Sequence, residues 1–281
     1  MLTKSGTVRG SLSTADGGWM GKNIIRLVIG LFVMFSSCAW DVSAQQESDM
    51  YDNARLLYMG QASIRITTRE GKVIYIDPYA GDGYEPAADL ILVTHSHYDH
   101  NGAAKVVNRN PDCQVITWKE ALAGGVHQTF DLGYVTVEAV EAGYNRWHDV
   151  RECVGYLLTL SDSISVYVTG DTSTTKQMPE LAVKQIDYAF FCCDGMFNMG
   201  LEEAAECAAM VNAKHNIPYH VLAQDGVYFD RSRAEQFDVP NRLIIDEGEE
   251  IMLVKEKPDK EDYILTSQHK KLFFKKGCLC Y

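Results

Sequence analysis

Six consecutive residues hold four side chains that can bind a metal ion. These are His95, His97, Asp99 and His100, within the run Thr94-His95-Ser96-His97-Tyr98-Asp99-His100-Asn101-Gly102. Neutral imidazole and carboxylate groups at this density favour zinc or a similar divalent ion. The motif therefore predicts a metal site rather than a polar loop with chance histidines.

The segment that precedes this motif positions it. Leu90-Ile91-Leu92-Val93 is short and apolar, which indicates a buried β-strand that ends at the histidines. On an extended backbone residues i and i+2 share a face, so His95 and His97 can bind one cation together. The chain must then turn, and Asp99 and His100 can point to a second cation. The motif thus predicts two neighbouring metal sites at one strand end.

Three other residues at the ends of strand-like segments could complete these sites. Ser165 to Thr169 leads into Asp171, Ile217 to Tyr219 leads into His220, and His148 precedes the strand-like residues 154–158. A lone histidine at a strand end is more often structural than a ligand. In this order behind the first motif, however, the three residues form a strong set.

The remaining apolar runs predict an α/β domain. Strands are expected at 56–66 and 72–77, joined around Glu70-Gly71, and at 114–117, 134–140, 155–160 and 165–169. Helices are expected at 103–107, capped by Asn101, and at 202–211. A short strand pair around Glu247-Gly248 is expected within 239–253. Strands followed by helices, with polar residues at the strand ends, predict two sheets covered by helices.

These motifs resemble those of the metallo-β-lactamase-fold hydrolases, specifically the branch that contains the ascorbate-6-phosphate lactonases. The resemblance covers residues 56–253 and rests on Gly60-Gln61-Ala62-Ser63, Ile76-Asp77-Pro78, Thr94 to Gly102, Gly170-Asp171-Thr172, the run 199–205 and Ile217-Pro218-Tyr219-His220. It implies an αββα four-layer sandwich with two metals at one edge.

The resemblance also implies the roles of the ligands. His95, His97 and His148 would bind the first metal, Asp99, His100 and His220 the second, and Asp171 would bridge both. The metals would be two divalent ions, Zn²⁺ or alternatively Mn²⁺. Two departures from the family pattern stand out. Gln61 replaces a histidine that is frequent there, and the segment 144–149 lacks the proline and glycine often found around the ligand at His148.

The expected activity is that of a binuclear hydrolase. A hydroxide that bridges the two metals would attack an ester, lactone, amide or phosphodiester bond of a small molecule. Asp99 would orient this nucleophile and then transfer a proton. The substrate-binding candidates are Tyr98, Tyr144 and Arg146, because they lie beside the ligands and Arg146 could hold an anionic group. The alternatives are an iron-dependent enzyme of oxygen or sulfur redox chemistry on the same fold, and a non-catalytic metal-binding envelope protein.

The N-terminal residues predict export. Lys22 and Arg26 precede an apolar run over 27–35, which is typical of a signal peptide. Cleavage after Ala44 leads to the periplasm, and lipidation of Cys38 would instead anchor the chain in the cell envelope. We therefore expect a leader and signal peptide over 1–44, a hydrolase domain over 51–254 and a lysine-rich tail over 255–281.

Charge limits the partners. The net charge of −12 argues against nucleic acid, because phosphate binding needs a basic face. A small-molecule substrate is expected, and it could be anionic because bound metals supply positive charge. Membrane contact is expected only through the signal peptide or a lipid on Cys38, and assembly into a homo-oligomer is left open.

Overall fold

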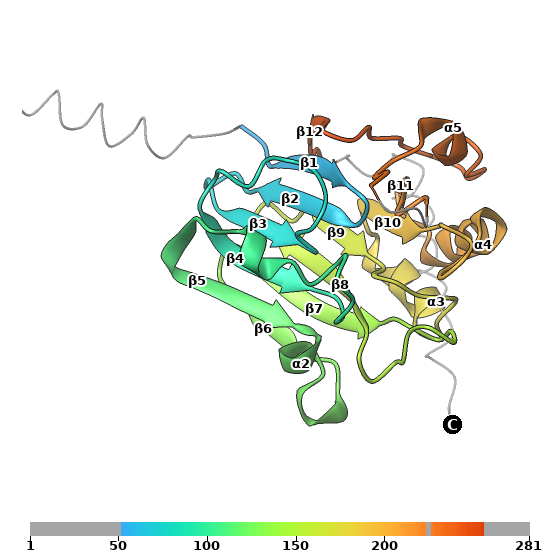
Figure 1. The fold of residues 1–281 in the computed structure, drawn as a ribbon, viewed down its shortest axis with the longest axis horizontal. Helices are drawn as coiled ribbons and strands as arrows, with labels where there is room; N and C mark the ends of the chain where they lie inside the picture. Colours follow the sequence, from blue (N-terminus) through green and yellow to red (C-terminus); the bar gives the residue numbers. More distant parts are fainter. Residues whose placement is uncertain (1–51, 223–225, 256–281) are drawn as a thin grey trace, which may run out of the picture. The chain divides into compact units, whose positions relative to one another are not determined.

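Two six-stranded β-sheets packed face to face form the domain in the computed structural model, which describes residues 52–222 and 226–255 (Figure 1). The predicted leader over 1–44, with its signal peptide and Cys38, lies outside the described residues, and so does the predicted tail beyond Lys255. Within the described ranges, no helix is long and apolar enough to cross a membrane.

The first sheet has the order β12-β1-β2-β3-β4-β5. Its strands are β1 (Arg55–Gly60), β2 (Ser63–Thr67), β3 (Val73–Ile76), β4 (Ala88–Val93), β5 (Arg109–Thr117) and β12 (Glu250–Met252). The pairs β3–β4 and β4–β5 are parallel, and the other pairs are antiparallel. All residues of β4 are buried, as its apolar sequence predicts.

The second sheet has the order β11-β10-β9-β8-β7-β6. Its strands are β6 (Thr129–Asp131), β7 (Val135–Glu141), β8 (Val154–Leu160), β9 (Ser165–Val168), β10 (Tyr188–Cys192) and β11 (His215–Tyr219). β9, β10 and β11 are mutually parallel, so their carboxyl ends lie at one edge of the sheet. Such an edge is where open α/β sheets bind their ligands.

Alternating side chains divide the apolar residues between two clusters. Leu56 and Tyr58 of β1 point into the main core between the sheets, whereas Leu57 and Met59 join a smaller cluster on the opposite face. That outer cluster packs against Val106 and other loop residues rather than against a long helix. The four-layer sandwich therefore has its first outer layer built mainly from loops.

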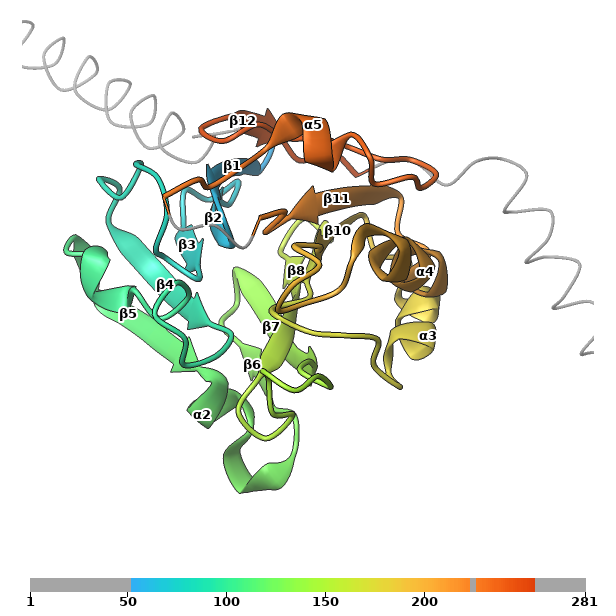
Figure 2. The ribbon, with the colours of Figure 1, turned by 45° about the vertical axis from the view of Figure 1, so that its right-hand side comes forward.

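Helices cover the outer face of the second sheet. Figure 2 shows α3 (Met178–Leu181) and α4 (Leu201–Val211) on the side away from the first sheet. α4 buries a stripe of small side chains, Ala204, Cys207 and Ala208, which lets it pack closely. The other short helices are α2 (Trp118–Ala121), α5 (Arg231–Ala234), η1 (Ala103–Lys105), η2 (Ala123–Gly125) and η3 (Ala182–Lys184). The predicted α/β sandwich is confirmed.

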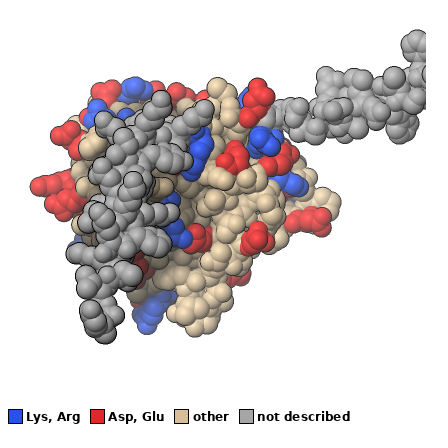
Figure 3. Space-filling view, turned by 180° about the vertical axis from the view of Figure 1, so that it is seen from behind, with Lys and Arg blue, Asp and Glu red and all other residues tan. Residues whose placement is uncertain are grey.

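Charged side chains are mixed on the face drawn in Figure 3. Lysine and arginine side chains lie scattered among aspartate and glutamate side chains there. The described residues visible in this view therefore form no continuous basic surface.

Three predicted elements were wrong. The strand predicted over 56–66 is two strands, because Gly60 and Gln61 adopt positive φ angles of 101° and 52° and form a tight turn. The helix predicted over 103–107 is only the 3₁₀ turn η1, which follows Gly102 and has no side-chain cap. The closing strand pair predicted within 239–253 is one strand, β12, which pairs with β1 instead.

Gly102 should not tolerate a side chain. A Cβ atom there would lie 1.8 Å from the carbonyl oxygen of Pro78, so the loop that carries the metal motif would have to move. We expect Gly102→Ala to lower the free energy of unfolding by about 3 kcal/mol or more. Gly200→Ala is the matched control, because no atom lies within 4 Å of its Cβ position and it should cost about 1 kcal/mol or less. Urea denaturation of both variants checks this, and equal losses would contradict it.

Candidate metal centre

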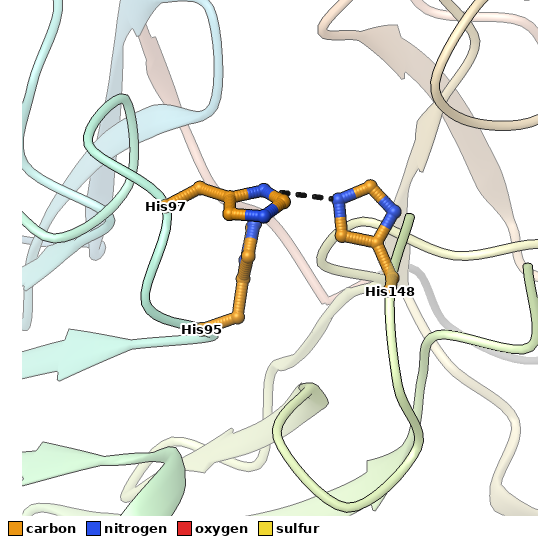
Figure 4. Close-up of side chains that lie close together, drawn as sticks. All are labelled: His95, His97 and His148. Atoms are coloured by element: carbon orange, nitrogen blue, oxygen red, sulfur yellow. Dashed lines mark hydrogen bonds between the residues drawn. The ribbon is translucent and has the colours of Figure 1, made fainter. Parts of the chain in front are cut away.

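All seven predicted ligands lie at one edge of the two sheets. The motif 95–100 follows β4, Asp171 follows β9, and His220 follows β11, whereas His148 lies in the loop before β8. Figure 4 shows His95, His97 and His148 turned toward one another, with His97 Nδ1 3.2 Å from His148 Nε2. The ends of strands that are far apart in the sequence therefore lie close together in space.

The ligand atoms form three overlapping groups. Within each group, one nitrogen or oxygen atom of every residue lies within 4.8 Å of the others. The groups are His95, His97 and His148; His95, His100 and Asp171; and Asp99, His100 and His220. The first and third are the sets that the family resemblance implies for the two metals.

Asp171 lies between these two sets. Its Oδ2 atom is 3.3 Å from His148 Nε2 and 3.7 Å from His220 Nε2, and its Oδ1 atom is 3.4 Å from His100 Nε2. One buried carboxylate thus faces ligands of both sets. This is the position that a bridging ligand requires.

The donor atoms at the centre fit a bound cation. His95 Nε2, His100 Nε2 and Asp171 Oδ1 are buried, and none has a hydrogen-bond partner among the described residues. Buried polar atoms are normally paired, so atoms without partners need an explanation. Nitrogen and oxygen atoms that converge in this way suit zinc or manganese.

Asp77 fixes the tautomers of one histidine from each set. Its carboxylate accepts hydrogen bonds from the Thr94 amide (2.7 Å), the Thr94 hydroxyl (2.6 Å) and His100 Nδ1 (2.8 Å). The Thr94 oxygen can then accept from His95 Nδ1, 3.0 Å away. Both imidazoles therefore carry a proton on Nδ1 and direct Nε2 into the centre, the usual arrangement of metal-binding histidines.

Asn145 holds His148 in place. Its Oδ1 atom accepts from the backbone amide of His148 at 3.0 Å and from His148 Nδ1 at 3.0 Å. Asn145 therefore supplies the local order that proline and glycine would otherwise give this loop. The sequence analysis missed this role, although a short polar residue three positions before a ligand is a typical turn signal.

Gln61 supports the second set from the turn between β1 and β2. Its Nε2 atom donates to Asp99 Oδ2 at 3.1 Å and lies 2.9 Å from His220 Nε2. Its carbonyl oxygen accepts from the backbone amide of His220 at 3.0 Å. Gln61 thus holds the carboxylate and the histidine at a fixed separation, in the position where the family often has histidine.

Backbone strain gathers at this centre. Gln61, Asp77 and His220 are buried non-glycine residues with φ angles of 52°, 44° and 47°. Each such residue stores about 1–3 kcal/mol of strain unless its surroundings relieve it, and such residues cluster at functional sites. The hydrogen bonds that fix them, such as Asp77 N–H to the Leu92 carbonyl (2.9 Å), hold the strained ends in place.

The ionisable groups show that the centre attracts positive charge. Burial alone would lower the pKa of His100, but the Asp171 and Asp77 carboxylates raise it well above its ordinary value. His220 has a raised pKa because Asp171 and Asp99 outweigh its burial. The pKa of Asp171 is well below its usual range because His100 and His220 outweigh the effect of burial. In contrast, burial and the neighbouring histidines lower the pKa of His95.

A cavity of about 370 Å³ opens onto the ligands. It is lined by His97, Tyr98, Asp99, Trp147, His148, Asp171, Phe197 and His220. Of the predicted substrate residues, only Tyr98 is among these. Arg146 instead stacks on the Trp147 ring, 4.3 Å from its centroid, and Tyr144 lines a separate cavity together with His127. Trp147 and Phe197, which the sequence analysis did not single out, also line the cavity.

Comparisons with known proteins agree with this geometry. A family model described as "Beta-lactamase superfamily domain" matches residues 55–220. A UPF0173 metal-dependent hydrolase of Thermococcus kodakarensis is 29% identical over 231 residues, which cover 71% of this chain and 99% of that protein. A second one, from Geobacillus sp., is 30% identical over 204 residues, 61% of this chain and 89% of that protein.

Solved structures are similar too. A Parabacteroides distasonis protein described as a metal-dependent hydrolase has a TM-score of 0.54 at 26% identity, covering 66% of this chain and 90% of that one. A metallo hydrolase of Ignicoccus hospitalis shares the fold with a TM-score of 0.59 at 17% identity, covering 73% of this chain and 100% of that one.

Asp77→Asn should remove metal as well as stability. An asparagine cannot accept every hydrogen bond that this carboxylate accepts, which should cost about 1–3 kcal/mol per unpaired buried donor. The substitution should also leave the imidazole rings of His95 and His100 without a fixed orientation. Asp89→Asn is the matched control, because Asp89 is a buried carboxylate that joins β3 to β4 at their other ends through Val73 N–H (2.9 Å). Both variants should lose stability, but only Asp77→Asn should lose zinc in elemental analysis. Equal zinc content would contradict this role.

If each ligand set holds one ion, acidification should empty the two sets in order. The pKa values of His100 and His220 are raised, so protons compete with metal for these side chains at a pH above the ordinary pKa of histidine. The pKa values of His95 and His97 are lowered, so these two side chains stay neutral to a lower pH. As pH falls, the set with His220 should therefore release its ion first. Dialysis from pH 8 to pH 5 followed by elemental analysis should show two steps. His220→Ala should show only the step at lower pH, and a single shared step in the wild type would refute this order.

Proposed function

Because the chain belongs to the metallo-β-lactamase superfamily and is a metal-dependent hydrolase, we propose that it is a binuclear enzyme. It cleaves an ester, lactone, amide or phosphodiester bond of a small molecule. The observation that carries the proposal is the position of Asp171, whose two oxygens face histidines of both ligand sets.

The ligands divide as follows. His95, His97 and His148 would hold one divalent ion and Asp99, His100 and His220 the other, and Asp171 would serve both. When bound, two such ions supply hydroxide at neutral pH and polarise the oxygen of the scissile group. Zn²⁺ is the favoured ion, because five of the seven ligands are histidines, and Mn²⁺ is the alternative.

Asp99 is the residue that accepts and returns the proton. It lines the cavity, and its pKa is lowered because the nearby imidazoles of His220 and His100 outweigh the effect of its burial. The carboxylate is therefore ionised, and it can take a proton from the attacking water and return it to the leaving group. Gln61 Nε2 fixes Asp99 Oδ2 in the orientation that this transfer needs.

Buried Asp171 keeps its charge throughout. It is almost fully shielded from solvent, and the histidines around it lower its pKa, so it stays ionised and compensates the positive centre.

Elemental analysis and an activity screen test the proposal together. The purified chain should carry about two zinc or manganese ions, and Asp171→Ala should lose most of this metal. Asp149→Ala is the matched control, because Asp149 follows His148 directly but is exposed and pairs with Arg151. Asp99→Asn keeps an oxygen ligand but cannot take up a proton, so kcat on any ester, lactone, amide or phosphodiester that the screen finds should fall about 10²–10⁴-fold.

Two outcomes would overturn the proposal. One iron ion per chain without hydrolysis would favour oxygen or sulfur redox chemistry on this fold. Metal content that is unchanged in Asp171→Ala would show that the carboxylate does not join the two sets.

A further inference from the structure

The wall of the metal cavity is aromatic, and the described residues that line it include no lysine or arginine. Its lining outside the ligand sets consists of Tyr98, Trp147 and Phe197. These side chains are 64%, 45% and 38% exposed, which is unusual for three large rings that meet at one cavity. Their common location therefore needs a cause other than packing of the core.

Trp147 and Phe197 form a single surface from two separate loops. Their rings meet edge to face, with centroids 5.5 Å apart and an interplanar angle of 75°. Trp147 lies in the loop between β7 and β8, and Phe197 in the loop between β10 and α4. Tyr98 belongs to the metal motif itself, and its ring packs edge-on against Tyr79 at 5.7 Å.

The backbone amide beside each of the two rings is held by a side chain that also lies next to a histidine of a ligand set. Asn145 Oδ1 accepts from the backbone amide of Trp147 at 2.9 Å and also from His148 Nδ1 at 3.0 Å. Asp194 Oδ1 accepts from the backbone amide of Phe197 at 2.7 Å, and Asp194 Oδ2 lies 3.7 Å from His220 Nδ1. The aromatic surface is therefore built as part of the metal centre, one ring for each ligand set.

The nearby cations are engaged elsewhere. The Arg146 guanidinium stacks over Trp147 and does not line the cavity. Arg233 donates to the carbonyl oxygen of Asp194 at 2.7 Å and is only partly exposed. Among the residues placed by the structure, an anionic group on the substrate, away from the scissile bond, would thus find no basic side chain in the wall.

From these observations we infer that the substrate is a neutral carboxylic ester, lactone or amide with an aromatic ring next to the scissile group. The ring packs against the Trp147–Phe197 surface while the carbonyl group faces the ligand sets. Offset and edge-on ring contacts favour an aromatic group over an aliphatic group of the same size. The volume of about 370 Å³ lies at the small end of ligand cavities, which suits one ring with a short side chain. This inference rests on the proposed hydrolase function.

The kinetic experiment compares matched esters on the zinc-loaded full chain. Benzyl acetate and ethyl phenylacetate carry a ring on opposite sides of the bond, ethyl acetate has none, and cyclohexylmethyl acetate has the bulk without the aromatic ring. We expect kcat/KM for at least one aromatic ester to exceed that for ethyl acetate and for cyclohexylmethyl acetate by about tenfold. Adding a carboxylate to the ring, as in 4-(acetoxymethyl)benzoate, should lower kcat/KM relative to benzyl acetate.

Substitutions of Trp147 and Phe197 test whether the preference for aromatic esters comes from the Trp147–Phe197 surface. Trp147→Ala and Phe197→Ala should each reduce the aromatic preference to about twofold or less, and Trp147→Phe should restore most of it. Val183→Ala is the control, because Val183 is 83% exposed on η3 and does not line the cavity. Zinc content is measured for every variant, so that loss of the centre is not mistaken for loss of the surface. A preference that survives in the Trp147→Ala, Phe197→Ala double variant would overturn the inference, and so would a higher rate on the charged ester.

A binding experiment tests this inference independently of the proposed function. Saturation-transfer NMR with benzamide, cyclohexanecarboxamide and acetamide needs no turnover. If no ester, lactone, amide or phosphodiester is hydrolysed but benzamide binds selectively and loses this in Trp147→Ala, the hydrolase proposal fails and the aromatic specificity stands. If esters are hydrolysed without aromatic preference and benzamide does not bind selectively, the hydrolase proposal stands and the aromatic specificity fails.

Discussion

One buried carboxylate, that of Asp77, sets the geometry on which the centre depends. It closes the end of β3 against the end of β4 through Thr94, and it orients His100 directly and His95 through the Thr94 hydroxyl. These two histidines belong to different ligand sets. Both halves of the centre are therefore aligned by a single residue that faces away from the cavity, and the sheet register and the metal geometry cannot vary independently.

The sheets supply the remaining alignment. Because β9, β10 and β11 are parallel, Asp171, Asp194 and His220 arrive at one edge from three successive strands. The main core between the sheets holds this edge opposite the end of β4. Residues in strained backbone conformations, such as Asp77 and His220, are tolerated there because their amides are hydrogen-bonded across the two sheets and their turns.

Much of this centre could be predicted from the sequence, and the reasons are local. The apolar run before His95 and the run before Asp171 identify strand ends by composition alone. The turn at Gln61 and the failure of a helix after Asn101 could not be predicted in this way, because both follow from tertiary contacts: Gln61 N–H bonds to the Tyr228 carbonyl at 2.6 Å, and Gly102 packs against Pro78. Likewise, Arg146 seemed suited to an anion by type, but its stacking on Trp147 is decided only in three dimensions.

Asn145 accepts hydrogen bonds from both Trp147 and His148, so it couples the binding of a compound in the cavity to the binding of metal. A compound that packs against Trp147 also restrains Asn145, and Asn145 restrains the imidazole of His148. Thermodynamic reciprocity then applies: if bound metal raises the affinity for the compound by some factor, the compound raises the affinity for the metal by the same factor. Where that factor exceeds one, occupancy of the cavity would protect the enzyme from chelators, and an enzyme without substrate would be the form most readily stripped of its ions.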